Sequence, residues 1–590
     1  MTFDEAPCSH EHARTAHLST ASAGSERTDR FRAARDLLLE LRHDHDAAYE
    51  RFRWPRFEHF NWALDWFDPI ARGNARPALR IVTADGVTSV AYECLAHRSS
   101  QVANWLRGIG VRRGDRVLVM LDNQVEVWEV MLAAIKLGAA VVPTYTSAAP
   151  TDVAERIERA AISHLVVTDR VAAKLASLPA GLTRVAVGAP VPGWLAYTDA
   201  DGADAAFVPD APTGADDPLF MYFTSGTTSR PKLAVHTHTS YPVGHLSGMY
   251  WNGLRPGDRH VNISAPGWAK HAWSSFFVPF NAEATLIAVN APAGRFDVLL
   301  EALLSEDATS FCAPPTVWRQ LIQEDLGRWP VRLREAGSVG EPLSPEVIEQ
   351  VRAAWGVTVR DGFGQSETTA QIGNSPHLPL RPGSMGKPLP GYRVLLLDPE
   401  TGREATEGEL CVDLSGERPV GVMPGYLDDP EKNAATFAGG VYHTGDIAHR
   451  DADGYLTYVG RKDDVFKSYD HRISPFELES VLLEHPDVAE AAVVPVPDPI
   501  GLSVPKAFVS LAAGRPADAD TARSVLDHTR RRLPPHQWIR LLEFVDLPKT
   551  TSGKIRRAEL RRARPAGDGR EFRADDLLGA GTTLAAPGMG

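Results

Sequence analysis

The chain has 590 residues, enough for several domains and a large buried core. It is 43% hydrophobic and 23% charged, which is ordinary for a globular protein. Its formal net charge of -13 argues against an extended nucleic-acid-binding surface, so we expect no nucleic-acid partner.

The four cysteines, Cys8, Cys94, Cys312 and Cys411, are widely spaced along the chain. This spacing predicts neither a disulfide framework nor a zinc site, and it favours a cytoplasmic location. The most apolar stretch, residues 130–143, contains a lysine and a glycine and is too short to cross a bilayer. We therefore expect no membrane span.

Residues 1–30 are polar and lack an apolar core, so they predict a disordered N-terminal extension rather than a secretory signal. Further along, strand-like and helix-like runs alternate at 115–121, 125–138, 139–145, 155–163 and 164–169. Such alternation with short connections predicts an α/β fold, in which helices cover a largely parallel sheet. Ligands are expected at the carboxyl ends of its strands.

A second, smaller domain is indicated near the C-terminus. Ser474, Pro475 and Glu477 match a helix N-cap, first turn and capping box. Strand-like runs at 489–497 and 506–513 and a helix-like run at 517–534 follow. We expect a large N-terminal domain of several subdomains with mixed sheets at 31–462, a small mobile α+β domain at 463–565 and a disordered tail at 566–590.

The stretch "FTSGTTSRPK" (223–232) directly follows an apolar, strand-like run. Its glycine lets a backbone approach a ligand closely, while its hydroxyls and lysine suit a polyphosphate; these residues are Thr224, Ser225, Gly226, Thr227, Thr228 and Lys232. It is not the common nucleotide-binding loop, because Pro231 precedes the lysine and Leu233 follows it.

Three further motifs follow in the chain: "DGFGQSETT" (361–369), "YHTGDIA" (442–448) and "LPKTTSGKIRRAEL" (547–560). Together with "GRKDDVFKS" (460–468), their order and spacing resemble the adenylate-forming superfamily of acyl-CoA synthetases, firefly luciferase and peptide-synthetase adenylation domains. The resemblance covers roughly residues 50–565. The segments "GWAKHAWSSFF", "GEPLSPEV" and "PFELES" look most like acetyl- and medium-chain acyl-CoA synthetases.

The resemblance implies that ATP activates a small-molecule carboxylic acid as an acyl-adenylate with release of pyrophosphate. Thr224, Ser225, Thr227 and Lys232 would then hold the β- and γ-phosphates. Glu367 matches the Mg²⁺ carboxylate, and Ser366 would lie beside the α-phosphate. Gly340, Glu341 and Pro342, with Phe363 stacking on the base, match the adenine-binding segment. By the same resemblance, Asp361, Gly362 and Gln365 would be further ATP-binding residues.

The same resemblance assigns the ribose and the moving parts. Asp446 and Arg461 match the pair that fixes the ribose, and Lys554 would bridge the carboxylate and the α-phosphate as a catalytic residue. Asp463 matches the hinge about which the small domain swings between its adenylating and thioester-forming poses.

Two positions depart from the family pattern. Ser229 stands where a glycine is usual in the phosphate loop. Asp470 stands where related acyl-CoA synthetases carry a glycine, in the loop that lines the pantetheine tunnel. A carboxylate there would obstruct the thiol and repel CoA, which puts use of CoA in doubt.

The acid is expected to be larger than propionate. Acetyl- and propionyl-CoA synthetases have a tryptophan at the position of Gly364, and a glycine would open the pocket. Its expected walls include Trp268, Trp273 and Gly373. Two alternatives stay open: an adenylating enzyme whose product a separate thioester-forming enzyme or carrier protein takes, and a nucleotide-binding pseudoenzyme.

Overall fold

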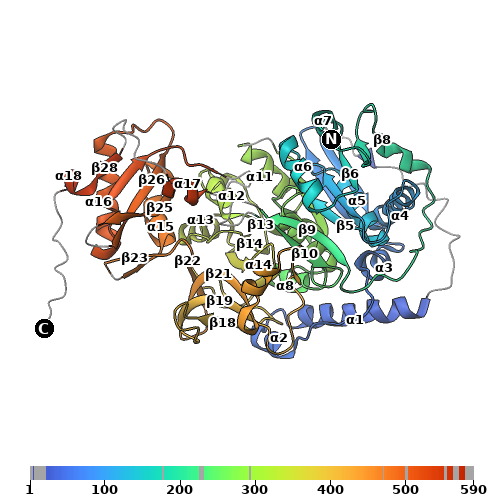
Figure 1. The fold of residues 1–590 in the computed structure, drawn as a ribbon, viewed down its shortest axis with the longest axis horizontal. Coiled ribbons are helices and arrows are strands. Elements are labelled where there is room, and N and C mark those ends of the chain that lie inside the picture. The colour runs from blue at the N-terminus through green and yellow to red at the C-terminus, as the bar shows by residue number, and fades with distance from the viewer. Residues whose placement is uncertain are drawn as a thin grey trace. The chain divides into compact units, whose positions relative to one another are not determined.

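The structure is a computed structural model (Figure 1), which describes residues 4–5, 21–175, 178–224, 231–291, 294–469, 471–498, 502–549, 555–562 and 571–578. The chain divides into two compact units. The first comprises Met1–Val394, Val412–Tyr442 and Ala452–Leu456, and the second comprises Leu395–Cys411, His443–Asp451 and Thr457–Gly590. The second unit thus includes segments that precede residue 463, the boundary that the motifs predict.

The first unit holds a ten-stranded sheet with the order β1-β3-β2-β12-β11-β13-β14-β15-β16-β17. The strands from β2 through β12, β11, β13 and β14 to β15 run parallel. The strand bounds are β1 Asp4–Glu5, β2 Pro77–Thr83, β3 Gly86–Ala91, β11 Arg259–Asn262, β12 Thr285–Val289, β13 Ser310–Ala313, β14 Glu335–Val339, β15 Val359–Gly364, β16 Ala370–Gly373 and β17 Lys387–Pro388.

An eight-stranded sheet of the same unit has the order β20-β10-β9-β5-β4-β6-β7-β8. Its strands are β4 Arg116–Met120, β5 Ala140–Pro143, β6 His164–Thr168, β7 Thr183–Val187, β8 Leu195–Ala196, β9 Pro218–Thr224, β10 Lys232–Thr237 and β20 Gly425–Tyr426. The strands β4, β5, β6, β7, β8 and β9 pair in parallel, which confirms the α/β class.

In the second unit, β19 and β21 are neighbours in a sheet with the order β18-β19-β21-β22. A two-stranded sheet and a four-stranded sheet of order β25-β26-β27-β28 follow. The bounds are β18 Val394–Leu397, β19 Glu407–Asp413, β21 Val441–Arg450, β22 Leu456–Arg461, β23 Phe466–Ser468, β24 His471–Ile473, β25 Val488–Asp498, β26 Leu502–Leu511, β27 Leu541–Phe544 and β28 Glu571–Arg573.

The helices of the first unit are gathered beside these sheets, as Figure 1 shows for α4, α5 and α6 next to β5 and β6. Their bounds are α1 Ala21–Glu40, α2 His45–Arg51, α3 Asp68–Ala71, α4 Tyr92–Gly108, α5 Val125–Leu137, α6 Pro150–Arg159, α7 Asp169–Lys174, α8 His245–Asn252, α9 Ala269–Ala272, α10 Val278–Asn281, α11 Phe296–Ser305, α12 Pro315–Leu321, α13 Pro345–Trp355 and α14 Pro430–Thr436. Those of the second unit are α15 Pro475–Leu483, α16 Ala519–Arg532, α17 Arg557–Arg562 and α18 Ala574–Leu578. Among the described residues, no helix combines the length and apolar character needed to cross a membrane.

Local sequence signals explain several helix ends. Helix α5 ends at Gly138, which takes a left-handed conformation (φ 72°) and donates its N–H to carbonyls of the last turn. Helix α15 begins after Ser474, whose hydroxyl accepts a hydrogen bond from the N–H of Glu477. The carboxylate of Glu477 accepts a hydrogen bond from Gln537 at 2.8 Å.

The expected disorder of residues 1–30 is wrong for its last third, because α1 begins at Ala21. Thr28 donates a hydrogen bond to the carbonyl of Asp65, and Arg27 forms an ion pair with the Asp65 carboxylate at 2.9 Å. Phe31 is fully buried and packs on Trp66, with ring centroids 4.7 Å apart. Long-range contacts, which a polar sequence does not reveal, therefore order this helix.

The expected disorder of residues 566–590 is also wrong in part. Strand β28 pairs antiparallel with β27, and Ala574 at the start of α18 is fully buried. Lys506 on β26 forms an ion pair with Glu571 of β28 at 2.5 Å. The segment 571–578 is thus an integral part of the small sheet.

Candidate active site

The predicted phosphate loop connects two antiparallel strands. Thr224 ends β9, Lys232 begins β10, and the two residues are paired across the ladder. Ser225, Gly226, Thr227, Thr228 and Ser229 lie outside the described residues. The structure therefore places the two ends of the loop side by side at the tip of a hairpin.

Glu367 lies opposite this hairpin tip, in the turn between β15 and β16. Its Oε1 accepts hydrogen bonds from the Thr224 hydroxyl at 3.3 Å and from the Tyr426 hydroxyl at 2.9 Å. Lys232 Nζ lies 5.5 Å from the centre of the Tyr426 ring. Residues from three separate segments thus bring one carboxylate, two hydroxyls and one ammonium group together.

The candidate adenine segment lies at the carboxyl ends of β14 and β15, where a parallel sheet binds ligands. Gly340, Glu341 and Pro342 directly follow β14, and Gly340 has a φ of 110° that favours glycine. Asp361, Gly362, Phe363 and Gly364 form the end of β15. The carboxylate of Glu341 accepts a hydrogen bond from Arg319 at 3.1 Å.

Asp361 is buried at this strand end. Its two oxygens accept hydrogen bonds from the backbone N–H groups of Gly362 at 2.9 Å and of Leu343 at 3.3 Å. Burial nevertheless raises the pKa of Asp361 to about 8. The side chain tethers β15 to the segment that follows β14.

Gln365 and Ser366 each form a hydrogen bond with a buried side chain. The Gln365 amide oxygen accepts a hydrogen bond from the Tyr442 hydroxyl at 2.6 Å. His236 Nε2 lies 2.8 Å from the Ser366 carbonyl, and burial lowers the pKa of His236 to about 4, so the imidazole is neutral. A carbonyl only accepts, so Nε2 carries the proton and Nδ1 is free to accept from the Ser240 hydroxyl at 3.1 Å.

The second unit carries the candidate ribose pair. Asp446 on β21 is 4% exposed, and its Oδ1 lies 3.2 Å from Nη1 of Arg461. The Tyr458 hydroxyl donates a hydrogen bond to the same oxygen at 3.3 Å. The backbone N–H of Asp446 donates to the Thr444 hydroxyl, and Asp463 forms an ion pair with Arg461 at 3.6 Å. These partners hold the Asp446 carboxylate in a fixed orientation.

The candidate acyl-pocket residues are packed more tightly than expected. A Cβ atom on Gly364 would lie 2.3 Å from the indole of Trp273, so this indole occupies the space beside the glycine. A Cβ atom on Gly373 would likewise lie 2.4 Å from the indole of Trp251. Trp268 lies at the start of α9 and packs edge to face on Tyr145, 5.7 Å between ring centroids.

Trp273 begins a π-helical segment, Trp273–Phe277, between α9 and α10. Such segments are rare and are frequently found at functional sites. Its indole is 5% exposed, and the His245 ring lies 5.4 Å away. Asp470 and Lys554 lie outside the described residues.

Sequence patterns did not identify several partners of the site, namely Tyr426, Tyr442, Tyr458, His236 and Arg319. Each belongs to a segment far along the chain from the residue that it contacts. Tyr426, for example, is 59 residues from Glu367. The strand-like run of β10, in which residues 233–237 are all buried, is the signal that would have marked His236 as buried.

A cavity of about 460 Å³ lies at the amino ends of β14 and β15, away from the candidate site. Arg334 and Arg360 on its wall are ion-paired with Asp258 and Glu335. These pairs tie together the amino ends of β11, β14 and β15. We assign this cavity no part in nucleotide binding, because parallel strands present ligands at their opposite ends.

Comparison with known proteins gives the family. The description "AMP-binding enzyme" matches residues 70–427, and "AMP-binding enzyme C-terminal domain" matches residues 477–554. The chain is 40% identical to 4-hydroxybutyrate–CoA ligase 1 of Metallosphaera sedula, over 85% of this chain and 90% of that protein. It is 36% identical to the mitochondrial acyl-coenzyme A synthetase ACSM3 of Mus musculus, over 86% and 90% of the two chains.

Similar solved structures are also CoA ligases. The anthranilate CoA ligase AuaEII in complex with anthranoyl-AMP has a TM-score of 0.78 and 29% identity, over 86% of this chain and 98% of that one. A benzoate CoA ligase from Burkholderia xenovorans has a TM-score of 0.72 and 28% identity, over 85% and 100%. The chain belongs to the AMP-binding enzyme family and, within it, to the AMP-forming acyl-CoA synthetases, which use ATP and CoA.

Proposed function

We propose that this enzyme activates a carboxylic acid larger than propionate as an acyl-adenylate and then transfers the acyl group to CoA. The observation that carries the proposal is that Thr224 and Tyr426 both donate hydrogen bonds to the Glu367 carboxylate, while Lys232 Nζ lies 5.5 Å from the centre of the Tyr426 ring. An ammonium and a carboxylate held apart around a hydroxyl-rich hairpin tip suit a polyphosphate with its bound cation.

Glu367 and its neighbours fit Mg²⁺, because the groups present are a carboxylate and hydroxyls, and Mg²⁺ prefers oxygen ligands. Bound there, the ion would neutralise charge on the phosphates. Lys232 would contact the β- and γ-phosphates together with the hairpin residues Thr224, Ser225, Thr227 and Thr228. Tyr426 orients the carboxylate through its hydroxyl.

The nucleoside contacts are proposed from the motifs. Gly340, Glu341 and Pro342 would line the adenine, and Phe363 would stack on it. Asp446 and Arg461 would hold the ribose, because a fixed, buried carboxylate is a strong acceptor for two vicinal hydroxyls. Ser366 would lie beside the α-phosphate, positioned by the neutral His236 through its backbone carbonyl.

Lys554 is the proposed catalytic group that stabilises charge as the carboxylate attacks the α-phosphate. Asp463 is the proposed hinge, and residues 463–565 are the proposed mobile domain. Lys554→Ala should retain ATP binding and lose pyrophosphate release by about two to three orders of magnitude. Unchanged pyrophosphate release in this variant would overturn the assignment.

The acid is proposed from the pocket and the relatives. The similar proteins are named for 4-hydroxybutyrate, anthranilate and benzoate, all larger than propionate. Gly364 leaves room for the indole of Trp273, so Trp273 sets the depth of the pocket on this side. Trp268 would stand at its entrance.

Use of CoA is supported by the names of the relatives. They are a CoA ligase and an acyl-coenzyme A synthetase, and this chain matches 90% of the length of each. This weighs against the alternative in which a separate enzyme or carrier takes the adenylate. The intact Lys232, Glu367 and Asp446 weigh against a pseudoenzyme. A cytoplasmic location is also proposed, because Cys312 and Cys411 carry thiols that form no disulfide in the described part of the chain.

The test is pyrophosphate release with a panel of acids from acetate to benzoate, with and without CoA. Glu367→Gln should lower the rate by about two orders of magnitude and raise the Mg²⁺ concentration required. Glu349→Gln, an exposed carboxylate on α13, is the matched control and should change neither. Equal behaviour of the two variants would refute the role of Glu367.

A further inference from the structure

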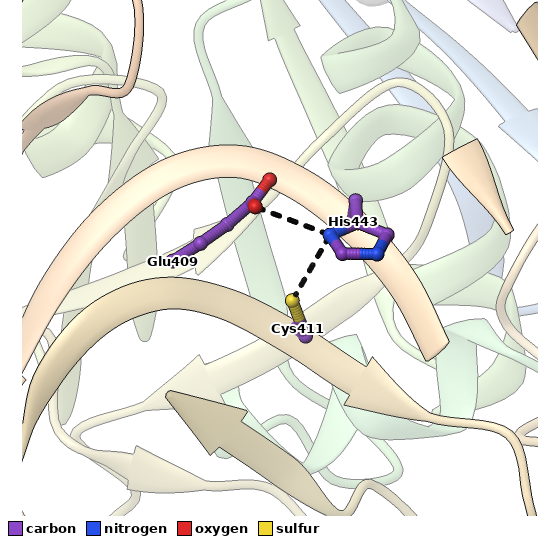
Figure 2. A group of neighbouring side chains, drawn as sticks. All are labelled: Glu409, Cys411 and His443. Atoms are coloured by element: carbon purple, nitrogen blue, oxygen red, sulfur yellow. Dashed lines mark hydrogen bonds and ion pairs between the residues drawn. The ribbon is translucent and has the colours of Figure 1, made fainter. Parts of the chain in front are cut away.

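Three potential metal ligands from two neighbouring strands converge in the second unit (Figure 2). Glu409 and Cys411 lie two residues apart on β19, so their side chains point to the same face of the strand. His443 lies on β21, the adjacent strand of the sheet. We call these three residues the Glu409 cluster.

The three ligand atoms are spaced as metal ligands are. Glu409 Oε2 lies 3.1 Å and Cys411 Sγ lies 3.5 Å from Nδ1 of His443, and all three atoms lie within 4.8 Å of one another. Tetrahedral zinc, with bonds of about 2.3 Å to sulfur and about 2.1 Å to nitrogen or oxygen, places its ligand atoms roughly 3.4 to 3.6 Å apart. The two distances to Nδ1 of His443 therefore differ by only a few tenths of an ångström from those of a tetrahedral site.

The same contacts argue against a catalytic relay. In a nucleophile–histidine–carboxylate relay, the two partners bind different nitrogens of the imidazole. Here the thiol and the carboxylate both contact Nδ1 of His443. Figure 2 shows both dashed lines ending at this one nitrogen. The groups face a common point, which is the arrangement of a binding site for a cation.

The residues around the cluster hold the ligands in place before a cation binds. Glu409 and Cys411 are buried, while His443 is partly exposed and gives access from solvent. Glu409 Oε1 accepts a hydrogen bond from the backbone N–H of Gly445 at 3.2 Å, which orients the carboxylate. Lys462 Nζ lies 2.8 Å from Oε2, and its half-exposed side chain is free to turn toward solvent when a cation binds.

We propose that Glu409, Cys411 and His443 bind a thiophilic divalent cation of the zinc class, with water as the fourth ligand. Thiolate and imidazole ligands select zinc-class ions, whereas Mg²⁺ requires an octahedral set of oxygens. The site is therefore chemically distinct from the Glu367 carboxylate. The proposal departs from the expectation drawn from cysteine spacing, which considered only pairs of cysteines.

Cation binding would change the protonation of the ligands and would not oxidise or reduce any group. The Cys411 sulfur loses its proton to solvent as the metal–sulfur bond forms, and Lys462 gives up its ion pair with Glu409. Two negative ligands then balance the two positive charges of the ion.

The site adjoins the strand that carries the candidate ribose carboxylate. Gly445, bonded to Glu409, directly precedes Asp446, and Thr444 donates a hydrogen bond to the carbonyl of Leu410 between the two β19 ligands. Pulling Glu409 toward an ion would strain the Gly445 contact. We expect bound cation to weaken nucleotide binding, and nucleotide to weaken cation binding by the same factor.

The direct experiment is titration of the purified chain, freed of metal with a chelator, with Co²⁺ as a spectroscopic probe for zinc. One equivalent should give the intense visible bands of tetrahedral cobalt and a thiolate-to-cobalt charge-transfer band, both removed by Zn²⁺ and unaffected by excess Mg²⁺. Cys411→Ser should abolish the charge-transfer band. His443→Gln should weaken binding more than about tenfold.

Cys94→Ser is the control, because Cys94 is a cysteine that lies outside the cluster. It should leave the spectrum and the affinity unchanged. If Cys411→Ser does not fold, Glu409→Gln and His443→Gln test the site at its more polar ligands. Absence of the charge-transfer band in the unmodified chain, or its persistence in His443→Gln with unchanged affinity, would overturn the proposal.

Discussion

Trp273 fills the space that a side chain at position 364 would need. A Cβ on Gly364 would lie 2.3 Å from Cη2 of the indole and 2.5 Å from the backbone carbonyl oxygen of Thr369. The glycine thus admits a tryptophan from another segment, so the absence of a side chain does not by itself make the pocket larger. The size of the acid depends on how far this indole reaches.

Trp273→Leu should enlarge the acyl pocket. We expect the ratio of kcat/KM for a long acid to that for a short acid to rise by at least about tenfold, since each added methylene in a fitting pocket is worth roughly 1 to 3 kcal/mol. Gly364→Ala is the matched comparison and should cost about 1 to 3 kcal/mol of stability by overpacking without lengthening the pocket. An unchanged preference in Trp273→Leu would remove the indole from the pocket wall.

Gly364→Trp alone has no space for its indole and should fold poorly. The double variant Gly364→Trp, Trp273→Ala removes the indole at position 273 and places one at position 364, so the same region again holds one indole. The double variant should be more stable than Gly364→Trp in thermal unfolding, and this recovery should exceed the effects of the single changes added together. Additive effects would mean that the two positions are independent.

Asp446→Asn should weaken ATP binding through the ribose. Removing a charged acceptor of hydrogen bonds costs about 1.5 to 3 kcal/mol, which corresponds to roughly 10- to 150-fold in KM for ATP. Tyr458→Phe removes only a hydroxyl that orients Oδ1, and a few-fold effect is expected. If 2′-deoxy-ATP is used as well by Asp446→Asn as by the unmodified enzyme, the loss is specific to the ribose. An equal penalty on ATP and 2′-deoxy-ATP would contradict a ribose contact.

Asp361 should make stability fall as the pH rises. Burial raises its pKa from about 3.8 to about 8, so between these values the folded chain holds a proton that the unfolded chain has lost. The free energy of unfolding then decreases by about 1.4 kcal/mol per pH unit from this group and levels off above pH 8. Asp361→Asn should flatten this slope between pH 6 and pH 8 in denaturant unfolding. An unchanged slope would show that Asp361 is ionised in the folded chain.

Local signals in the sequence were enough for the elements that they specify. Gly138 ends α5 because the left-handed cap favours glycine, and Ser474 begins α15 because its hydroxyl satisfies a free backbone N–H. Motif order grouped Thr224 with Glu367, and the structure joins these two side chains by a hydrogen bond. In each of these cases the determining residues are adjacent or belong to a motif of fixed length.

Contacts between distant segments were not predictable in the same way. The hydroxyl of Tyr426 reaches Glu367, and the indole of Trp273 reaches Gly364, only because separate strands and helices end at the same place. Helix α1 was missed because its order depends on Asp65 and Trp66 rather than on its own composition. The Glu409 cluster was missed because one of its ligands is on another strand.

Asp470→Gly should accelerate the second half-reaction. The family resemblance implies that residue 470 lines the pantetheine tunnel, so a glycine there would leave space for pantetheine and would remove a charge that repels CoA, while the adenylation residues stay unchanged. We expect faster acyl-CoA formation with an unaltered rate of exchange between pyrophosphate and ATP. Asp470→Asn, which keeps the size and removes the charge, separates steric from electrostatic obstruction. A slower thioester step in Asp470→Gly would mean that the carboxylate assists the thiol.

The central claim is that one chain carries out both half-reactions. The most direct measurement follows pyrophosphate, acyl-adenylate and acyl-CoA together in a quenched time course of the unmodified enzyme with ATP, Mg²⁺, CoA and the best acid of the panel. The account predicts one acyl-CoA for each pyrophosphate released, with acyl-adenylate only as a transient. Stoichiometric acyl-adenylate that persists in the presence of CoA, with no acyl-CoA formed, would contradict it.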